Sequence, residues 1–117
     1  MSSTTRPSPA RKVSSVFKQF VLDQLGDLGD VTARSMFGGV GLYHRGVFFG
    51  IIARDVLYLK VDDSTRRDYV RARMKPFKPF PDRPSMKKYY AVPIDVLESP
   101  PELALWARKA VAAAETA

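Results

Sequence analysis

Residues that could do chemistry are few in this chain. It has no cysteine and one histidine, which excludes disulfides, thiolate catalysis and cysteine-based zinc sites and argues against a histidine-rich metal centre. His44 could act as a general base, but it precedes a predicted turn and has no identifiable partner, so an exposed turn histidine is the simpler interpretation. Asp62 and Asp63 could be paired carboxylates, but helix capping explains them better. The sequence therefore predicts no catalytic residue, no metal ligand and no cofactor.

The most glycine-rich stretch, Phe37 to Gly41, could be taken for a phosphate-binding loop. Such a loop would continue into Gly-Lys-Ser/Thr and a helix, and a dinucleotide-binding fingerprint also opens a helix. Here a strand-like segment follows and no lysine does. The pattern favours a bulged or bent strand with close backbone approach, so Gly39→Val should destabilise the fold.

Positive charge is concentrated in two places. The formal net charge is +7, with +4 in residues 1–18 and +6 in residues 54–88, while the rest of the chain is net negative. In and just after the basic segment 66–88, aromatic residues are interleaved with Lys and Arg, a combination that can hold single-stranded nucleic acid. These aromatic residues are Tyr69, Phe77, Phe80, Tyr89 and Tyr90. The alternative is a solvated basic face over a core that the rings help to build. The cations predicted for nucleic-acid binding are Arg66, Arg67, Arg71, Arg73, Lys75, Lys78, Lys87 and Lys88.

The first half of the chain supplies one helix and a meander. Apolar residues recur at helical spacing from Val13 to Leu28, and Gly26 and Gly29 end the pattern. Residues 31–61 contain short β-rich runs with turn signals between them, which predicts about four antiparallel strands. Arginine is a poor residue for positive φ, so we expect a type I turn at Arg45-Gly46 with Gly46 in a bulge, rather than a type I′ turn.

The second half adds two helices and a strand. Residues 62–64 offer capping side chains for a helix over residues 64–73, with acids placed four residues before Arg66 and Arg67. Four prolines make residues 75–85 an extended segment, and residues 87–92 can form a final strand. The sequence Ser99-Pro100-Pro101-Glu102 predicts a capping box that opens the last helix.

This order of elements predicts an α+β fold of two layers, with helices packed on an antiparallel sheet of about five strands. Residues 1–12 are expected to be a disordered basic tail and residues 13–117 a single domain. No apolar run approaches a membrane span, and the first residues do not form a secretory signal. We therefore expect a cytoplasmic protein that does not enter membranes.

The segment from Arg34 to Tyr43 resembles the Arg-x-Met-Phe-Gly-Gly-x-Gly-Leu-Tyr signature of the TfoX/Sxy family's N-terminal domain. Residues 57–62, 89–93 and 106–109 match further motifs in the family's order. The resemblance covers about residues 13–114 and implies a secretion-chaperone-like arrangement of sheet and helices. The motif residues that it singles out, as structural or contact residues, are Arg34, Met36, Phe37, Gly38, Gly39, Gly41 and Tyr43.

Full-length members of that family regulate natural competence by acting on transcription of DNA-uptake genes, and they carry a second, helical domain. The resemblance therefore implies a non-enzymatic regulatory module that acts through protein partners. A homodimer formed through a sheet edge or an exposed sheet face would suit such a module. Two alternatives stay open: nucleic-acid binding by the basic segment 66–88, and a small enzyme with a deep pocket near Tyr43, His44 or Tyr58.

Overall fold

An antiparallel sheet forms the frame of the molecule. The computed structural model describes residues 14–36, 38–79 and 85–116, so the expected tail lies outside the described residues. The strands are β1 (Val31–Met36), β2 (Gly39–His44), β3 (Val47–Ala53), β4 (Val56–Lys60), β5 (Pro76–Phe77) and β6 (Met86–Ala91). They are arranged in the order β1-β2-β3-β4-β6-β5. The α+β prediction is confirmed, with a short sixth strand, β5, in the segment that the prolines predicted only as extended.

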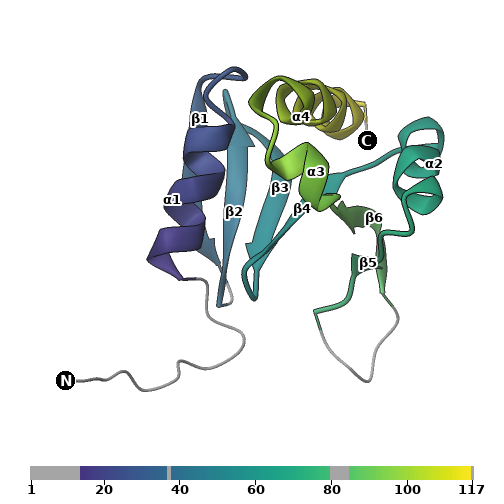
Figure 1. Ribbon diagram of the computed structural model, residues 1–117, viewed down its shortest axis with the longest axis horizontal. Coiled ribbons are helices and arrows are strands. Elements are labelled where there is room, and N and C mark those ends of the chain that lie inside the picture. The colour runs from purple at the N-terminus through teal and green to yellow at the C-terminus, as the bar shows by residue number, and fades with distance from the viewer. Residues whose placement is uncertain (1–13, 37, 80–84, 117) are drawn as a thin grey trace.

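The helices lie against one face of this sheet. They are α1 (Ser15–Gln24), α2 (Asp63–Arg71), α3 (Ile94–Leu97) and α4 (Pro100–Glu115). Figure 1 shows α1, α3 and α4 on the same side of the strands, with α2 beside β6. The core fills the space between them, where Leu42, Phe49 and Ile52 of the sheet meet Val21 of α1 and Leu103 of α4. Each of these five side chains is fully buried and contributes to the hydrophobic stabilisation of the fold.

Both central hairpins turn through two residues with positive φ. Arg45 and Gly46 have φ of 50° and 85°, and Arg54 and Asp55 have φ of 52° and 57°. These values are typical of type I′ turns, so the prediction of a type I turn at Arg45-Gly46 was wrong. The type I′ turn matches the right-handed twist of the strands. Arg45 is also held there, since its Nε donates to Asp30 Oδ2 at 3.0 Å.

Local capping signals determine where the longer helices begin. Asp62 Oδ1 accepts from the backbone N–H groups of Ser64 and Thr65 at 3.0 and 2.9 Å, and the Thr65 hydroxyl closes a capping box. Ser99 Oγ accepts from Glu102 N at 3.4 Å, and α4 begins at Pro100, as expected. The predicted capping box is not complete, because Ser99 N donates to the Val96 carbonyl oxygen at 3.1 Å rather than to the Glu102 side chain. The short helix α3 was not predicted.

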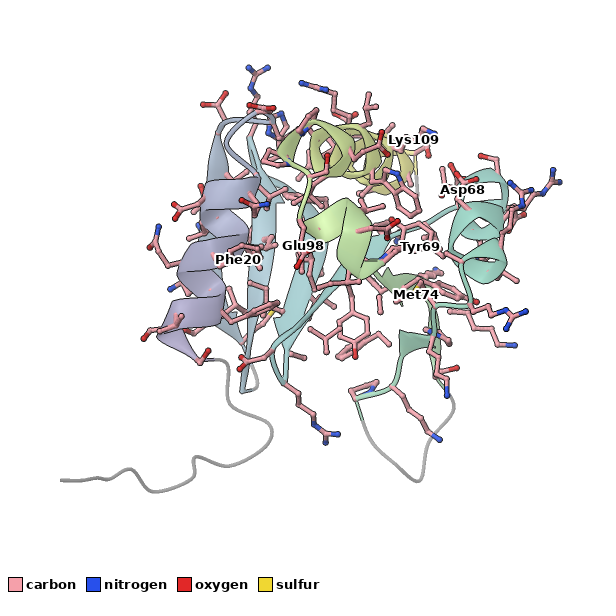
Figure 2. The ribbon with its side chains drawn as sticks, viewed as in Figure 1. Phe20, Asp68, Tyr69, Met74, Glu98 and Lys109 are labelled. Atoms are coloured by element: carbon pink, nitrogen blue, oxygen red, sulfur yellow. The ribbon has the colours of Figure 1, made fainter. Side chains whose placement is uncertain are left out.

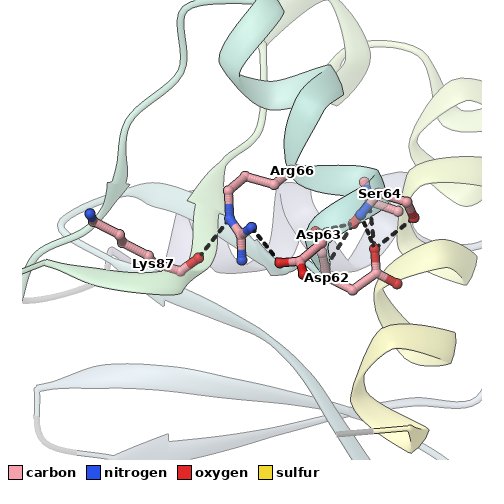
Figure 3. Close-up of polar contacts among 6 residues, drawn as sticks. Asp62, Asp63, Ser64, Arg66 and Lys87 are labelled. Carbon is pink, nitrogen blue, oxygen red and sulfur yellow. Dashed lines mark hydrogen bonds and ion pairs between the residues drawn. The ribbon is translucent and has the colours of Figure 1, made fainter.

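Helix α2 differs from its prediction in its length and its ion pairs. It ends at Arg71, two residues earlier than expected, and Arg73 beyond it has a φ of 63°. Asp62 is used as a cap, and Asp63 pairs with Arg66, three residues along, rather than with Arg67 (Figure 3).

Candidate functional site

The sheet has a second face that the described helices do not cover (Figure 1). Residues directly opposite each other in neighbouring strands point to the same side. The register pairs Arg34 with Gly41, Tyr43 with Phe48, Ile51 with Tyr58, and Lys60 with Tyr89. We call this side the open face, and the strands place on it Arg34, Met36, Gly39, Gly41, Tyr43, Phe48, Ile51, Tyr58, Lys60, Lys87 and Tyr89. Phe77 of β5 joins it through the contact of its ring with Tyr58.

Five aromatic rings lie on the open face in two groups, Tyr43 with Phe48 and Tyr89, and Tyr58 with Phe77. The ring centroids of Tyr43 and Phe48 are 5.2 Å apart, those of Phe48 and Tyr89 are 5.8 Å apart, and those of Tyr58 and Phe77 are 4.8 Å apart. Tyr89 is buried, and the other four rings are half-buried. Burial raises the pKa of Tyr58 and of Tyr89, so both phenols keep their protons at neutral pH.

Cations lie over this aromatic layer. The Arg34 guanidinium is 5.5 Å from the centroid of the Tyr43 ring, and Lys60 Nζ is 5.3 Å from that of Tyr89. Partial burial lowers the pKa of Lys60, and the neighbouring Lys88 adds to the effect. The open face therefore presents π-systems and positive charge together.

The glycine-rich motif builds this face. A Cβ at Gly39 would lie 2.7 Å from the Ile52 carbonyl oxygen, so this glycine lets the backbones of β2 and β3 approach. A Cβ at Gly41 would lie 2.6 Å from Met36 Sδ, so that glycine makes room for a side chain of β1. Gly38 has a φ of 80°, which favours glycine, and Phe37 lies outside the described residues. The motif thus shapes a surface.

The eight cations proposed for nucleic-acid binding are not gathered on one surface. On α2, Arg66 pairs with Asp63 at 2.8 Å and also donates to the Lys87 carbonyl at 3.3 Å (Figure 3). Arg71 lies 3.9 Å from Asp68. The other members are spread over the α2 surface, the segment after it and both sides of β6: Arg67, Arg73, Lys75, Lys78, Lys87 and Lys88. Acidic residues therefore interrupt this set, and its role in binding stays a prediction.

The aromatic residues of the same segment are divided between two places. Tyr69 points from α2 into the molecule (Figure 2), with its centroid 4.7 Å from that of Trp106 and 5.9 Å from that of Tyr90. Tyr69 and Tyr90 are buried and belong to the core, as the alternative interpretation expected. Phe77 and Tyr89 lie on the open face, and Phe80 is outside the described residues.

His44 is a structural residue rather than an exposed turn histidine. It is half-buried, and its Nδ1 lies 2.8 Å from the Gly29 carbonyl oxygen. A carbonyl oxygen only accepts hydrogen bonds, so Nδ1 carries the hydrogen and is the donor. This hydrogen bond connects the end of β2 to the loop between α1 and β1. This corrects the interpretation from sequence.

Two shallow hollows on the described surface lie away from His44. One runs along α2 and is lined by Asp63, Arg66, Arg67, Val70 and Arg71. The other lies between α2, α3 and α4 and includes Trp106. Neither contains Tyr43, His44 or Tyr58, where the enzyme hypothesis placed its pocket. Within residues 14–36, 38–79 and 85–116, no three acidic or histidine side chains could together hold a metal ion. None of the described helices is long and apolar enough to cross a membrane.

An antiparallel sheet has helices on one face and an aromatic surface, shaped by glycines, on the other, which defines a small α+β domain. Residues 23–114 match the TfoX N-terminal domain, and the chain belongs to that family. No curated protein matches the chain.

Sequence reasoning missed most of the open face. Tyr58 and Lys60 were visible as one side of an alternating strand, but their neighbours Phe48 and Tyr89 come from β3 and β6. The signal that could have joined them is the cross-strand register, which a single sequence does not contain.

Proposed function

We propose that this domain is a non-enzymatic regulatory module, which acts in competence-type transcription by binding other macromolecules, protein partners first. The observation that carries this proposal is the position of the family motif. Arg34, Met36, Gly41 and Tyr43 meet on the open face of the sheet, which is a surface suited to contact rather than an enclosed pocket. Membership of the TfoX N-terminal domain family, which is regarded as regulatory, supports the same function.

The proposal includes a cytoplasmic location, no cofactor and no catalytic residue. A homodimer is compatible with it, and sedimentation at micromolar protein would measure the oligomeric state. The competing hypothesis of a small enzyme receives no support from the two shallow hollows, because neither reaches the residues that it needs.

Deletion of the gene in its own host tests the regulatory role. Transcripts of DNA-uptake genes and transformation frequency should fall on deletion under competence-inducing conditions, and the native gene should restore both. Arg34→Glu, which reverses a charge on the open face, should fail to restore them. Lys109→Glu is the matched control, since Lys109 is exposed on α4, on the helix-covered side (Figure 2). Unchanged transcripts after deletion would overturn the proposal.

A further inference from the structure

We propose that the open face binds single-stranded nucleic acid, with bases stacked on its exposed rings and phosphates held by its cations. This goes beyond the proposed function and does not depend on a role in competence. It also moves the predicted nucleic-acid site from the α2 side of the basic segment to the opposite side of the sheet.

The charge of the open face favours a polyanion. Arg34, Lys60 and Lys87 lie on it, whereas none of its residues, as the described strands define it, is Asp or Glu. Two acids next to the strand ends have partners of their own: Asp30, just before β1, pairs with Arg45, and Asp55 Oδ1 in the β3–β4 turn accepts from Ser14 N at 2.8 Å. On α2, by contrast, carboxylates accompany the arginines. The open face is thus the surface on which phosphates would meet cations without interruption.

The aromatic rings of the open face indicate that the polyanion is a nucleic acid, because its bases can stack on them. Tyr43, Phe48 and Tyr58 are half-buried, so part of each side chain stays accessible. Tyr43 packs against Phe48, and Tyr58 packs against Phe77. Stacking on aromatic side chains tolerates any base, because every base has a π-face. A duplex keeps its bases stacked on each other and cannot offer them to these rings. The combination therefore selects single strands over double strands.

The same charge argues against a second copy of the chain on this face. In a two-fold symmetric contact the face would meet itself, so each copy would bring the same cations and no carboxylate to pair with them. Like charges placed opposite each other oppose such an interface. Self-association through the open face is therefore an outcome that the experiment must distinguish.

Fluorescence anisotropy with labelled oligothymidylate and oligouridylate tests the proposal, with a DNA duplex of equal length as comparison. Both single strands should bind, because they share stacking and phosphate chemistry, and the tighter one identifies the natural class. If the three cations of the face each contact one phosphate, the slope of log K against log salt should be about −2. Affinity should then fall on the order of 20-fold between roughly 50 and 200 mM salt.

Variants on the open face should weaken binding in two distinct ways. Tyr43→Leu keeps an apolar contact but removes the ring, and should lower affinity about 10-fold. Arg34→Gln should reduce the magnitude of the salt slope by about 0.7. Lys109→Gln on α4 and Arg67→Gln on α2 are the matched controls and should bind as the native protein does. Circular dichroism and thermal melting of each variant establish that it is folded. The salt dependence of binding is measured on the native protein, so it tests the proposal even if a variant does not fold.

Several results would overturn the proposal. No binding of either single strand at low salt, or equal binding of the duplex, removes single-strand recognition. Loss of binding in Arg67→Gln but not in Arg34→Gln places the site on α2. A dimer that dissociates in Tyr43→Leu, in a protein that binds neither strand, makes the open face a self-contact surface.

Discussion

Replacing Gly39 with alanine should destabilise the fold, although alanine is a small residue. The added Cβ would lie 2.7 Å from the carbonyl oxygen of Ile52, and that oxygen belongs to the neighbouring strand of the sheet. Because a backbone atom cannot rotate away, relief requires β2 and β3 to separate locally. Overpacking of this kind costs about 3 kcal/mol at the upper end of its range. Alanine also reduces the conformational entropy of the unfolded chain, which stabilises the folded state by about 0.5–1 kcal/mol. The free energy of unfolding should therefore fall by about 2 kcal/mol, or roughly 10 °C in Tm.

Gly41→Ala is the matched comparison within the same strand. Its Cβ would meet Met36 Sδ at 2.6 Å and Phe48 Cε1 at 3.1 Å, and the thioether is the flexible end of a side chain. We expect a smaller loss, below about 1 kcal/mol, which Met36→Ala in the same chain should relieve further. Urea and thermal unfolding followed by Trp106 fluorescence give both values. The reasoning fails if Gly39→Ala has the same melting temperature as the native protein, or if Gly41→Ala loses as much free energy of unfolding as Gly39→Ala. If Gly39→Ala instead keeps the native stability but no longer binds a macromolecular partner, the glycine-rich motif serves only as a contact surface.

Four further changes probe the rest of the structure. Phe49→Ala empties a fully buried site between sheet and helices and should cost about 4 kcal/mol in urea unfolding. Ser99→Ala removes the cap of α4, and its 3.4 Å hydrogen bond is long, so we expect a loss of about 0.5 kcal/mol by the same measurement. Hydrogen bonds from backbone and side-chain donors hold the pKa of Asp62 below 3.8, so the ionised carboxylate stabilises the fold at neutral pH. This stabilisation is lost as pH falls through the folded-state pKa. In Asp62→Ala, the free energy of unfolding should therefore decrease less steeply in acid. Burial raises the pKa of Tyr69, so the folded state keeps a proton that the unfolded chain loses near pH 10; stability should fall above that pH, and less steeply in Tyr69→Phe.

Local signals were enough to predict the elements whose ends are set by neighbouring residues. The start of α4 follows from a capping serine and a proline, which act within one turn. Strand β4 follows from alternation, since Leu57 and Leu59 are buried and Tyr58 and Lys60 are not. Both signals are complete within a few residues, so no tertiary information was needed.

The features that were not predicted depend instead on contacts between residues distant in the sequence. Arg45 adopts positive φ because the twist of two strands and the carboxylate of Asp30 make that turn favourable, and neither influence is visible in the dipeptide. Strand β5 has two residues and exists through its pairing with β6, which places Phe77 against Tyr58. In each case a contact distant in sequence outweighed the local preference.

The open face shows most clearly why the candidate site could not be predicted. Strict alternation along β3 would place Phe49 and Ile51 on one side and Phe48 on the other. The register shifts between Leu42 and Tyr43, so that Gly41 faces Ile51 while Tyr43 faces Phe48. Two residues of β2 therefore span three residues of β3, which brings Phe48 and Ile51 to the same side and leaves Phe49 fully buried in the core. This single irregularity thus places Phe48 on the same side as Ile51, where it completes the aromatic surface beside Tyr43 and Tyr89, while Phe49 stabilises the core.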